Sequence, residues 1–295
     1  MKEFEMLPVE QEIKIDGFNS IYYFEFGKDF THPPEVHDFW EFAYVDSGEI
    51  IAVTDGLGQT LKQGQIMFHR PMEVHAHISN KVTPNNMLVV TFTCSSPAMN
   101  FFDKRVFELG KNSKMLLTLF AEEARHIFGS ISGDYNNKNP LGTKHVSPES
   151  LQLLQCYLTE FLIKLKRQDE NSGSRIKKNE ISRDIAHSSI TELIIAYLEE
   201  NVYQNITTQD LCKKFYMSKS QLYQLFSDYS GDSPIHYHLK LKMAEAKKLL
   251  RDNKMTVSDV ADILGYTSIH NFSRAFKNAA GLSPAKYKNK ILSGE

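Results

Sequence analysis

The chain has 295 residues, with 34 Lys plus Arg against 36 Asp plus Glu, and this length predicts two domains with separate cores. No apolar run approaches the roughly 20 residues that span a bilayer, and the acidic start at residues 1–5 is unlike a secretory signal. Three scattered cysteines are expected to be free thiols. We therefore expect a cytoplasmic protein with no membrane partner.

Residues 1–95 predict a domain of short β-strands. Apolar or alternating runs recur there, and Gly, Pro and Asn separate them at close intervals. The runs are 21–26, 39–45, 50–54, 65–68, 74–78 and 87–92. This pattern is typical of a sandwich or a small barrel.

Polar residues of this region share strand faces. Alternate residues of a strand point to the same side, so Glu35, His37 and Glu41 share one face, and His75 and His77 share another. If both faces point inward, these five side chains converge inside the domain. The interior is then a candidate binding pocket for a small molecule.

The spacing of these residues resembles a known family. His37, Glu41 and Gly48, followed by Gly64, Pro71 and His75, are similar to the two conserved stretches of the cupin barrel, in the version joined to AraC-type domains as a ligand sensor. The resemblance implies an effector pocket. We expect a small polar effector, with a sugar as one candidate, in contact with Glu35, His37, Glu41, His75 and His77.

The same residues leave an enzyme as the alternative. Two imidazoles and a carboxylate can hold a divalent transition metal, so His37, Glu41 and His75 would be the ligands of a metal-dependent cupin enzyme. Metal-dependent cupins usually have a histidine at the position of Glu35. This departure favours a hydrogen-bonded pocket, and we expect no cofactor, no bound metal and no catalysis.

Residues 96–167 predict a helical segment. Its second helix carries apolar residues at i, i+3, i+7, i+10 and i+14, which is the spacing of a heptad-like seam. The seam is Leu151, Leu154, Leu158, Phe161 and Leu165. We expect it to form the contact of a homodimer. Polar residues follow, and they predict a flexible linker at 168–187.

The C-terminal residues 188–290 repeat one pattern at a spacing of 50 residues. Each copy has a polar N-cap, a helix with apolar residues four apart, a glycine stop and a Ser-Pro start of the next helix. Ser218, Leu222, Phe226, Gly231, Ser233, Pro234 and Tyr237 recur as Ser268, Phe272, Phe276, Gly281, Ser283, Pro284 and Tyr287. A short helix precedes each copy, so the repeat predicts two helix-turn-helix units that bind double-stranded DNA.

The exposed faces of the two second helices are the candidate reading surfaces. Gln, Asn and Arg pair with base edges in the major groove, whereas Lys and Ser suit phosphate. We expect base contacts from Ser220, Gln221, Tyr223, Gln224, Ile269, His270, Asn271, Ser273 and Arg274. We expect phosphate contacts from Lys219, Lys242, Ser268 and Lys277.

Residues 191–290 resemble the DNA-binding domain of the AraC/XylS family of bacterial transcription regulators. The resemblance rests on the stretch 260–266, then 271–277, and then Gly281-Leu282-Ser283-Pro284 with Tyr287. Cys212 stands where the family usually has alanine, and Lys242 and Lys288 stand where it often has arginine. The resemblance implies an effector-controlled, homodimeric regulator that also contacts RNA polymerase. The expected fold is α+β and multidomain, with a cupin-like barrel followed by an all-α domain.

Overall fold

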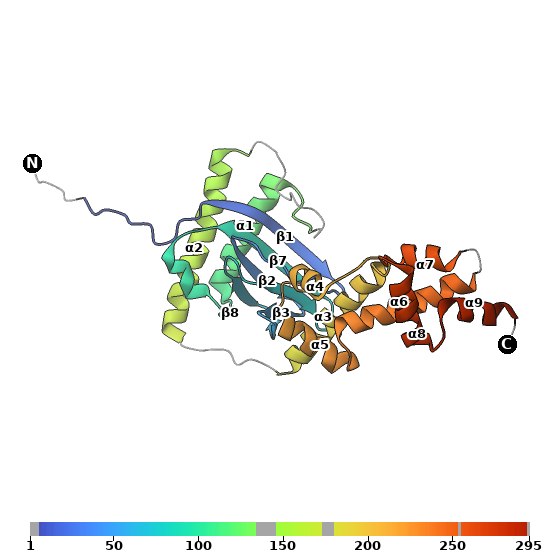
Figure 1. The fold of residues 1–295 in the computed structure, drawn as a ribbon. Helices are drawn as coiled ribbons and strands as arrows, with labels where there is room; N and C mark the ends of the chain where they lie inside the picture. Colours follow the sequence, from blue (N-terminus) through green and yellow to red (C-terminus); the bar gives the residue numbers. More distant parts are fainter. Residues whose placement is uncertain (1–5, 134–145, 173–179, 253–254, 294–295) are drawn as a thin grey trace, which may run out of the picture. The chain divides into compact units, whose positions relative to one another are not determined.

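The computed structural model describes residues 6–133, 146–172, 180–252 and 255–293, and it forms two compact units, Met1–Ala186 and His187–Glu295 (Figure 1). The predicted α+β architecture is confirmed, with β-sheets in the first unit and helices in the second. Within the described residues, every helix is too short or too polar to cross a membrane.

The strands of the first unit form two antiparallel sheets. They are β1 (Gly17–Phe26), β2 (Trp40–Ser47), β3 (Glu49–Thr54), β4 (Leu57–Lys62), β5 (Gln65–His69), β6 (His75–Ser79), β7 (Asn85–Thr93) and β8 (Val106–Glu108). The five-stranded sheet has the order β1-β7-β2-β5-β8, and the three-stranded sheet has the order β4-β3-β6. The predicted barrel is therefore not closed, and β8 lies beyond the predicted end of the strand region at residue 95.

Gly48 carries the chain from the larger sheet to the smaller one. It lies between β2 and β3 with φ +73°, and a Cβ there would lie 2.3 Å from the backbone oxygen of Pro84. Only glycine adopts this conformation without strain at so close an approach. The turn at Gly48 thus lets two consecutive strands belong to different sheets.

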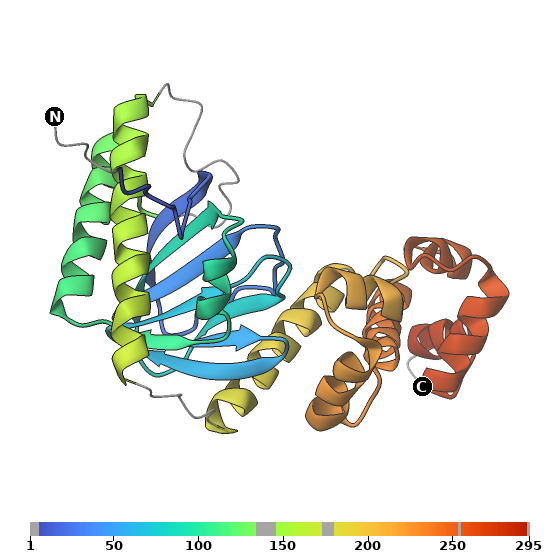
Figure 2. The same cartoon turned by 90° about the vertical axis from the view of Figure 1, so that its left-hand side faces the viewer.

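The larger sheet has a different partner on each face. Trp40, Phe42 and Tyr44 of β2 belong to the core beneath two helices, whereas Ala43 and Val45 belong to the core shared with the smaller sheet. The helices are α1 (Lys111–Phe128) and α2 (Pro148–Ser172), after the short 3-10 helix η1 (Pro97–Phe102). Figure 2 shows α1 and α2 side by side on one face of the sheet. The unit therefore has three layers.

The packing of α2 shows that the predicted dimer seam was wrong. Leu154, Leu158, Phe161 and Leu165 are each at most 2% exposed, and the ring centroid of Phe161 lies 6.1 Å from that of Phe42. Leu151, at 39% exposed, is the one seam residue that lies at the surface. The apolar stripe covers the sheet of its own chain because that sheet presents an equally apolar face.

Helix occupies both ends of the predicted linker. α2 runs to Ser172 and α3 (Glu180–Glu200) begins eight residues later, while residues 173–179 lie outside the described part. The boundaries predicted from the sequence stay predictions there.

The second unit contains the two predicted helix-turn-helix units. After α3 come α4 (Thr208–Lys214), α5 (Lys219–Ser230), α6 (Pro234–Arg251), α7 (Val257–Ile263), α8 (Ile269–Ala280) and α9 (Pro284–Ser293). α4 with α5 forms the first helix-turn-helix unit and α7 with α8 the second. α6 connects them.

The helix ends explain why the sequence repeats. Thr207 and Thr256 form capping boxes at the start of α4 and α7, and Ser218 and Ser268 cap α5 and α8. Gly231 and Gly281 end α5 and α8 in the left-handed conformation. Each repeated residue type thus satisfies backbone groups that a helix end leaves without intrahelical partners.

Candidate functional site

A cluster of histidines and carboxylates lies buried between strands of the two sheets. Glu41 projects from β2 directly opposite His69 of β5, and His75 and His77 lie on β6. Glu41 is 3% exposed, His69 is 0%, and His75 and His77 are each 1%. Charged groups are seldom so deeply buried unless they have partners, so this cluster is the candidate ligand site.

The structure brings the five predicted pocket residues together around Glu41. One carboxylate oxygen of Glu41 lies 3.3 Å from His37 Nε2, and the other lies 3.5 Å from His75 Nε2 and 3.9 Å from His77 Nδ1. Glu35 reaches the same place, with its Oε1 3.8 Å from His75 Nε2. Whether these residues bind an effector is a proposal that the geometry supports.

The groups of the cluster hold different charges near neutral pH. Burial raises the pKa of Glu41, but the imidazoles of His75, His37 and His77 outweigh burial and hold that pKa well below its usual range. Burial lowers the pKa of His75, yet the Glu41 carboxylate raises it to about 9. Glu41 and His75 thus form an internal ion pair.

The neighbours of that ion pair are neutral imidazoles. Burial lowers the pKa of His77 to about 3, and burial together with the charge of His75 holds the pKa of His69 well below its usual range. Burial and the charge of Glu41 raise the pKa of Glu35 to about 7. The cluster therefore offers a polar ligand both charged and neutral hydrogen-bonding groups.

Sequence reasoning missed two members of the cluster, His69 and Glu73. His69 Nδ1 lies 3.0 Å from Glu73 Oε2, and His75 Nδ1 lies 3.0 Å from the backbone oxygen of Glu73. The available signal was weak: His69 alternates in phase with Met67 of β5, whose side chain faces the smaller sheet. Only the pairing of β5 with β2 places His69 opposite Glu41.

The second helices of both helix-turn-helix units expose the predicted reading residues. Leu222 and Phe226 of α5 are buried, as are Phe272 and Phe276 of α8. The polar faces point away from these cores. The exposed or partly exposed residues are Ser220, Gln221, Tyr223, Gln224, Ile269, His270, Asn271, Ser273 and Arg274.

Several of these polar groups already have partners within the chain. Gln221 Oε1 accepts a hydrogen bond of 2.8 Å from the backbone N–H of Ser218, and Gln224 Nε2 donates one of 2.8 Å to Asp228. Ser268 Oγ accepts from the backbone N–H of Asn271 at 3.2 Å. Base or phosphate contacts by these groups would have to share or replace those bonds.

The prediction that Lys242 contacts phosphate was wrong. Lys242 is only 4% exposed, and its Nζ donates hydrogen bonds of 2.9 Å to Asn205 Oδ1 and to the backbone oxygen of Leu264. Asn205 Nδ2 in turn donates to the backbone oxygen of Gly265. Lys242 therefore ties the loop before α4 to the end of α7, because both pack on α6.

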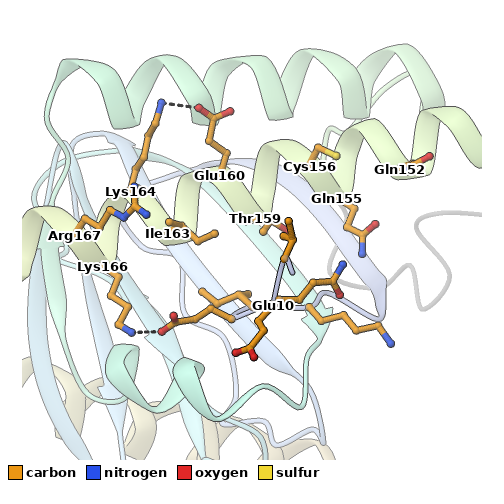
Figure 3. Close-up of a pocket in the computed structure, with 15 residues that line it drawn as sticks. Glu10, Gln152, Gln155, Cys156, Thr159, Glu160, Ile163, Lys164, Lys166 and Arg167 are labelled. Atoms are coloured by element: carbon orange, nitrogen blue, oxygen red, sulfur yellow. Dashed lines mark hydrogen bonds and ion pairs between the residues drawn. The ribbon is translucent and has the colours of Figure 1, made fainter. Parts of the chain in front are cut away.

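A groove lies at the surface of the first unit, away from the histidine cluster. The groove, of about 940 Å³, runs between residues 9–14 and α2 (Figure 3). Lys166 pairs with Glu12, and Lys164 Nζ lies 2.5 Å from Glu160. Because two of its lysines are paired with carboxylates and the described residues that line it form no buried polar cluster, the histidine cluster is the stronger candidate for a ligand site.

Two family models match the chain. The AraC-like ligand binding domain matches residues 18–97, which hold the histidine cluster, and a helix-turn-helix domain matches residues 211–290, which hold α5 and α8. The predicted sensor and DNA-binding domains are thereby confirmed. The matches give no support to the cupin enzyme considered as an alternative.

Curated relatives are regulators. The chain is 36% identical over 99 residues to the raffinose operon transcriptional regulatory protein RafR of Pediococcus pentosaceus, covering 34% of this chain and 36% of that protein. It is 27% identical over 143 residues to the transcriptional activator RhaR of Yersinia pestis, covering 48% and 47%. These matches span about a third to a half of the length of either relative.

One solved structure with similarity is the C-terminal domain of AraT from Geobacillus stearothermophilus. Sequence identity is 28%, the match covers 34% of this chain and 83% of that one, and the TM-score is 0.33.

Proposed function

This chain carries both domains of an AraC-family transcriptional regulator, and we propose that it binds a specific operator in double-stranded DNA under the control of a small polar effector. The observation that carries this proposal is the pair of exposed polar helix faces on α5 and α8, each backed by a buried apolar pair. A DNA-binding regulator works beside the chromosome, so we place it in the cytoplasm.

We assign base reading chiefly to α8. Arg274 is exposed on this helix and carries the fork of donors that pairs with guanine. Lys277 lies near the end of the same helix, where a phosphate contact suits its charge. α5 contributes through Ser220, Tyr223 and Gln224. Gln224 also donates to Asp228, and a base contact would share or replace that hydrogen bond.

The effector site is the cluster around Glu41. A molecule with several hydroxyl groups, such as a sugar, matches its mixture of carboxylate, imidazolium and neutral imidazole groups. An effector shifts DNA affinity only through its different affinity for the arrangements of the protein, typically by 1–3 kcal/mol. We also propose that the regulator works as a homodimer and contacts RNA polymerase, although the dimer contact is not the α2 seam.

The proposal is tested by selecting duplexes from fragmented genomic DNA with the full chain at near-physiological salt. We expect enrichment of sites with two short elements about one helical turn apart, the spacing of successive major grooves. Retention of DNA without sequence preference, lost on adding salt, would contradict operator recognition. Sedimentation at two protein concentrations tests the homodimer.

A further inference from the structure

Three buried groups of the cluster have the arrangement of metal ligands. One donor atom from each of Glu41, His69 and His77 lies within 4.8 Å of a donor atom of both others, and all three residues are buried. Two of these three, Glu41 and His77, belong to the predicted pocket. His69, the third, was not anticipated from the sequence.

Each of the two histidines has one ring nitrogen that makes no hydrogen bond to a described residue. Within the part of the chain that the structure describes, His69 Nε2 and His77 Nε2 are buried and make no hydrogen bond, whereas Glu41 Oε1 lies 3.5 Å from His75 Nε2 in the ion pair described above. A buried polar atom without a hydrogen bond costs about 1–3 kcal/mol. Two buried imidazoles with such atoms, grouped with the Glu41 carboxylate, therefore indicate a ligand that binds all three residues.

The surroundings of His69 orient it as a metal ligand. Its Nδ1 lies 3.0 Å from Glu73 Oε2, at hydrogen-bond distance, and Glu73 is itself 2% exposed. Burial raises the pKa of Glu73; when Glu73 is ionised it only accepts hydrogen bonds, so the proton then lies on Nδ1 of His69 and the lone pair on Nε2. A carboxylate behind a histidine is the usual support of a metal-ligating imidazole.

We propose that Glu41, His69 and His77 bind a divalent transition-metal ion. Two imidazoles and one carboxylate suit zinc or iron(II), whereas magnesium and calcium take oxygen ligands. Ligands about 2.0–2.2 Å from a tetrahedral ion lie roughly 3.3–3.5 Å apart, so donors within 4.8 Å of one another need to approach by at most about 1.5 Å. A fourth position remains for another donor.

This inference concerns the same site as the proposed effector, so its regulatory meaning rests on the proposed function, whereas metal binding itself does not. An ion held by β2, β5 and β6 would join strands of both sheets. It would also give an oxygen-rich effector a positively charged point of attachment.

The experiment is cobalt(II) titration of the untagged, chelator-treated full chain in the absence of DNA. We expect one equivalent per chain and the intense visible absorption of four-coordinate cobalt, displaced by zinc but not by magnesium. His69→Gln and His77→Gln should abolish the absorption. Glu73→Gln should weaken cobalt affinity by about 10–100-fold because it removes only the support of His69.

His126→Gln is the matched control, because His126 lies exposed on α1 of the same unit. It should bind cobalt like the unaltered chain, and circular dichroism should show that each variant is folded. If the unaltered chain takes up no stoichiometric cobalt, or if His69→Gln and His77→Gln bind it as His126→Gln does, the proposal fails. Operator selection is a separate measurement, so failure of one leaves the other standing.

Discussion

The two units of the molecule keep their polar groups in opposite places. The first unit buries a histidine–carboxylate cluster between its sheets and pairs an apolar sheet face with α1 and α2. The second unit has an apolar core, around Phe272 and Phe276 for example, and exposes polar residues such as Arg274 on its helix faces. The proposed effector would therefore contact buried groups of the first unit, whereas the proposed DNA contacts lie on the surface of the second.

A polar side chain also affects folding stability differently when it is exposed and when it is buried. An exposed residue such as Arg274 is solvated and can change with little effect on folding. A buried one such as Lys242 must be fully hydrogen-bonded, and here it bonds two loops at once. Two basic residues therefore differ in role: buried Lys242 stabilises the fold, and exposed Arg274 is available for contact with a partner.

The largest effect is expected from the α2 core. Phe161→Ala should lower the free energy of unfolding of the first unit by about 3–5 kcal/mol, because it empties a fully buried aromatic site. Urea unfolding followed by the fluorescence of Trp40, the single tryptophan, reports on the same core. The exposed change Lys164→Ala on α2 is the control.

Protein concentration decides between two interpretations of α2. A loss from Phe161→Ala that is the same at low and high protein concentration supports intrachain packing. A loss that disappears at high concentration would restore the seam as a dimer contact.

A smaller effect is expected from the buried lysine of the second unit. Lys242→Met should cost about 1.5–3 kcal/mol of folding stability, because it removes a charged donor from Asn205 and Leu264. Lys277→Ala should leave stability unchanged and lower the salt dependence of DNA binding by about one phosphate contact. If Lys242→Met instead left stability unchanged and lowered the salt dependence of DNA binding, Lys242 would be a phosphate contact after all.

Arg274→Ala tests the exposed face of α8. It should cost about 1–3 kcal/mol of affinity for the selected operator and relax base preference at one position. Fluorescence anisotropy with operator and random duplexes measures both. Equal losses on the two duplexes would remove Arg274 from base reading and leave it a phosphate contact.

The smallest effect is expected at the repeated helix caps. Thr256→Ala should cost the second unit about 0.5–2 kcal/mol, and Thr207→Ala a similar amount, because each removes an N-cap. Thermal unfolding followed by circular dichroism measures the cost. A large inequality between the two would show that the two helix-turn-helix units do not share their stability equally.

The cap of α7 also has a pH dependence. Hydrogen bonds from the backbone and side chain of Thr256 lower the pKa of Asp259 from its ordinary value of 3.8. Asp259 therefore stabilises the folded state above pH 3.8, and this contribution is lost as pH falls through the lowered pKa. Thr256→Ala should reduce that acid sensitivity, which unfolding at several pH values between 2 and 5 measures.

The second unit was predictable because its signals are local. Ser218 and Ser268 cap the helices that they begin, and Gly231 and Gly281 end them, so a short stretch of sequence carries all the information. The burial of Lys242 was not predictable in this way. Its partners, Asn205 and Leu264, are distant in the sequence, and a charged residue on a helix usually faces solvent.

The first unit was predictable only in outline. Strand alternation placed Glu35, His37 and Glu41 on one face, and the structure brings them near His75. Strand pairing is not local, so neither the opening of the barrel nor the position of His69 opposite Glu41 followed from the sequence. The seam of α2 had the correct periodicity and the wrong partner, because periodicity identifies an apolar face without identifying what covers it.

Because buried atoms of the cluster make no hydrogen bond within the described residues, a ligand that binds them should raise the melting temperature of the first unit. A molecule that binds the folded state at 100 times its Kd raises stability by about 2.7 kcal/mol, which for a unit of this size is a rise of roughly 5–10 °C in melting temperature. Compound libraries can therefore be screened by heat alone, before any operator is known. His77→Gln, which lacks one of the buried donors, identifies the compounds that act at the cluster.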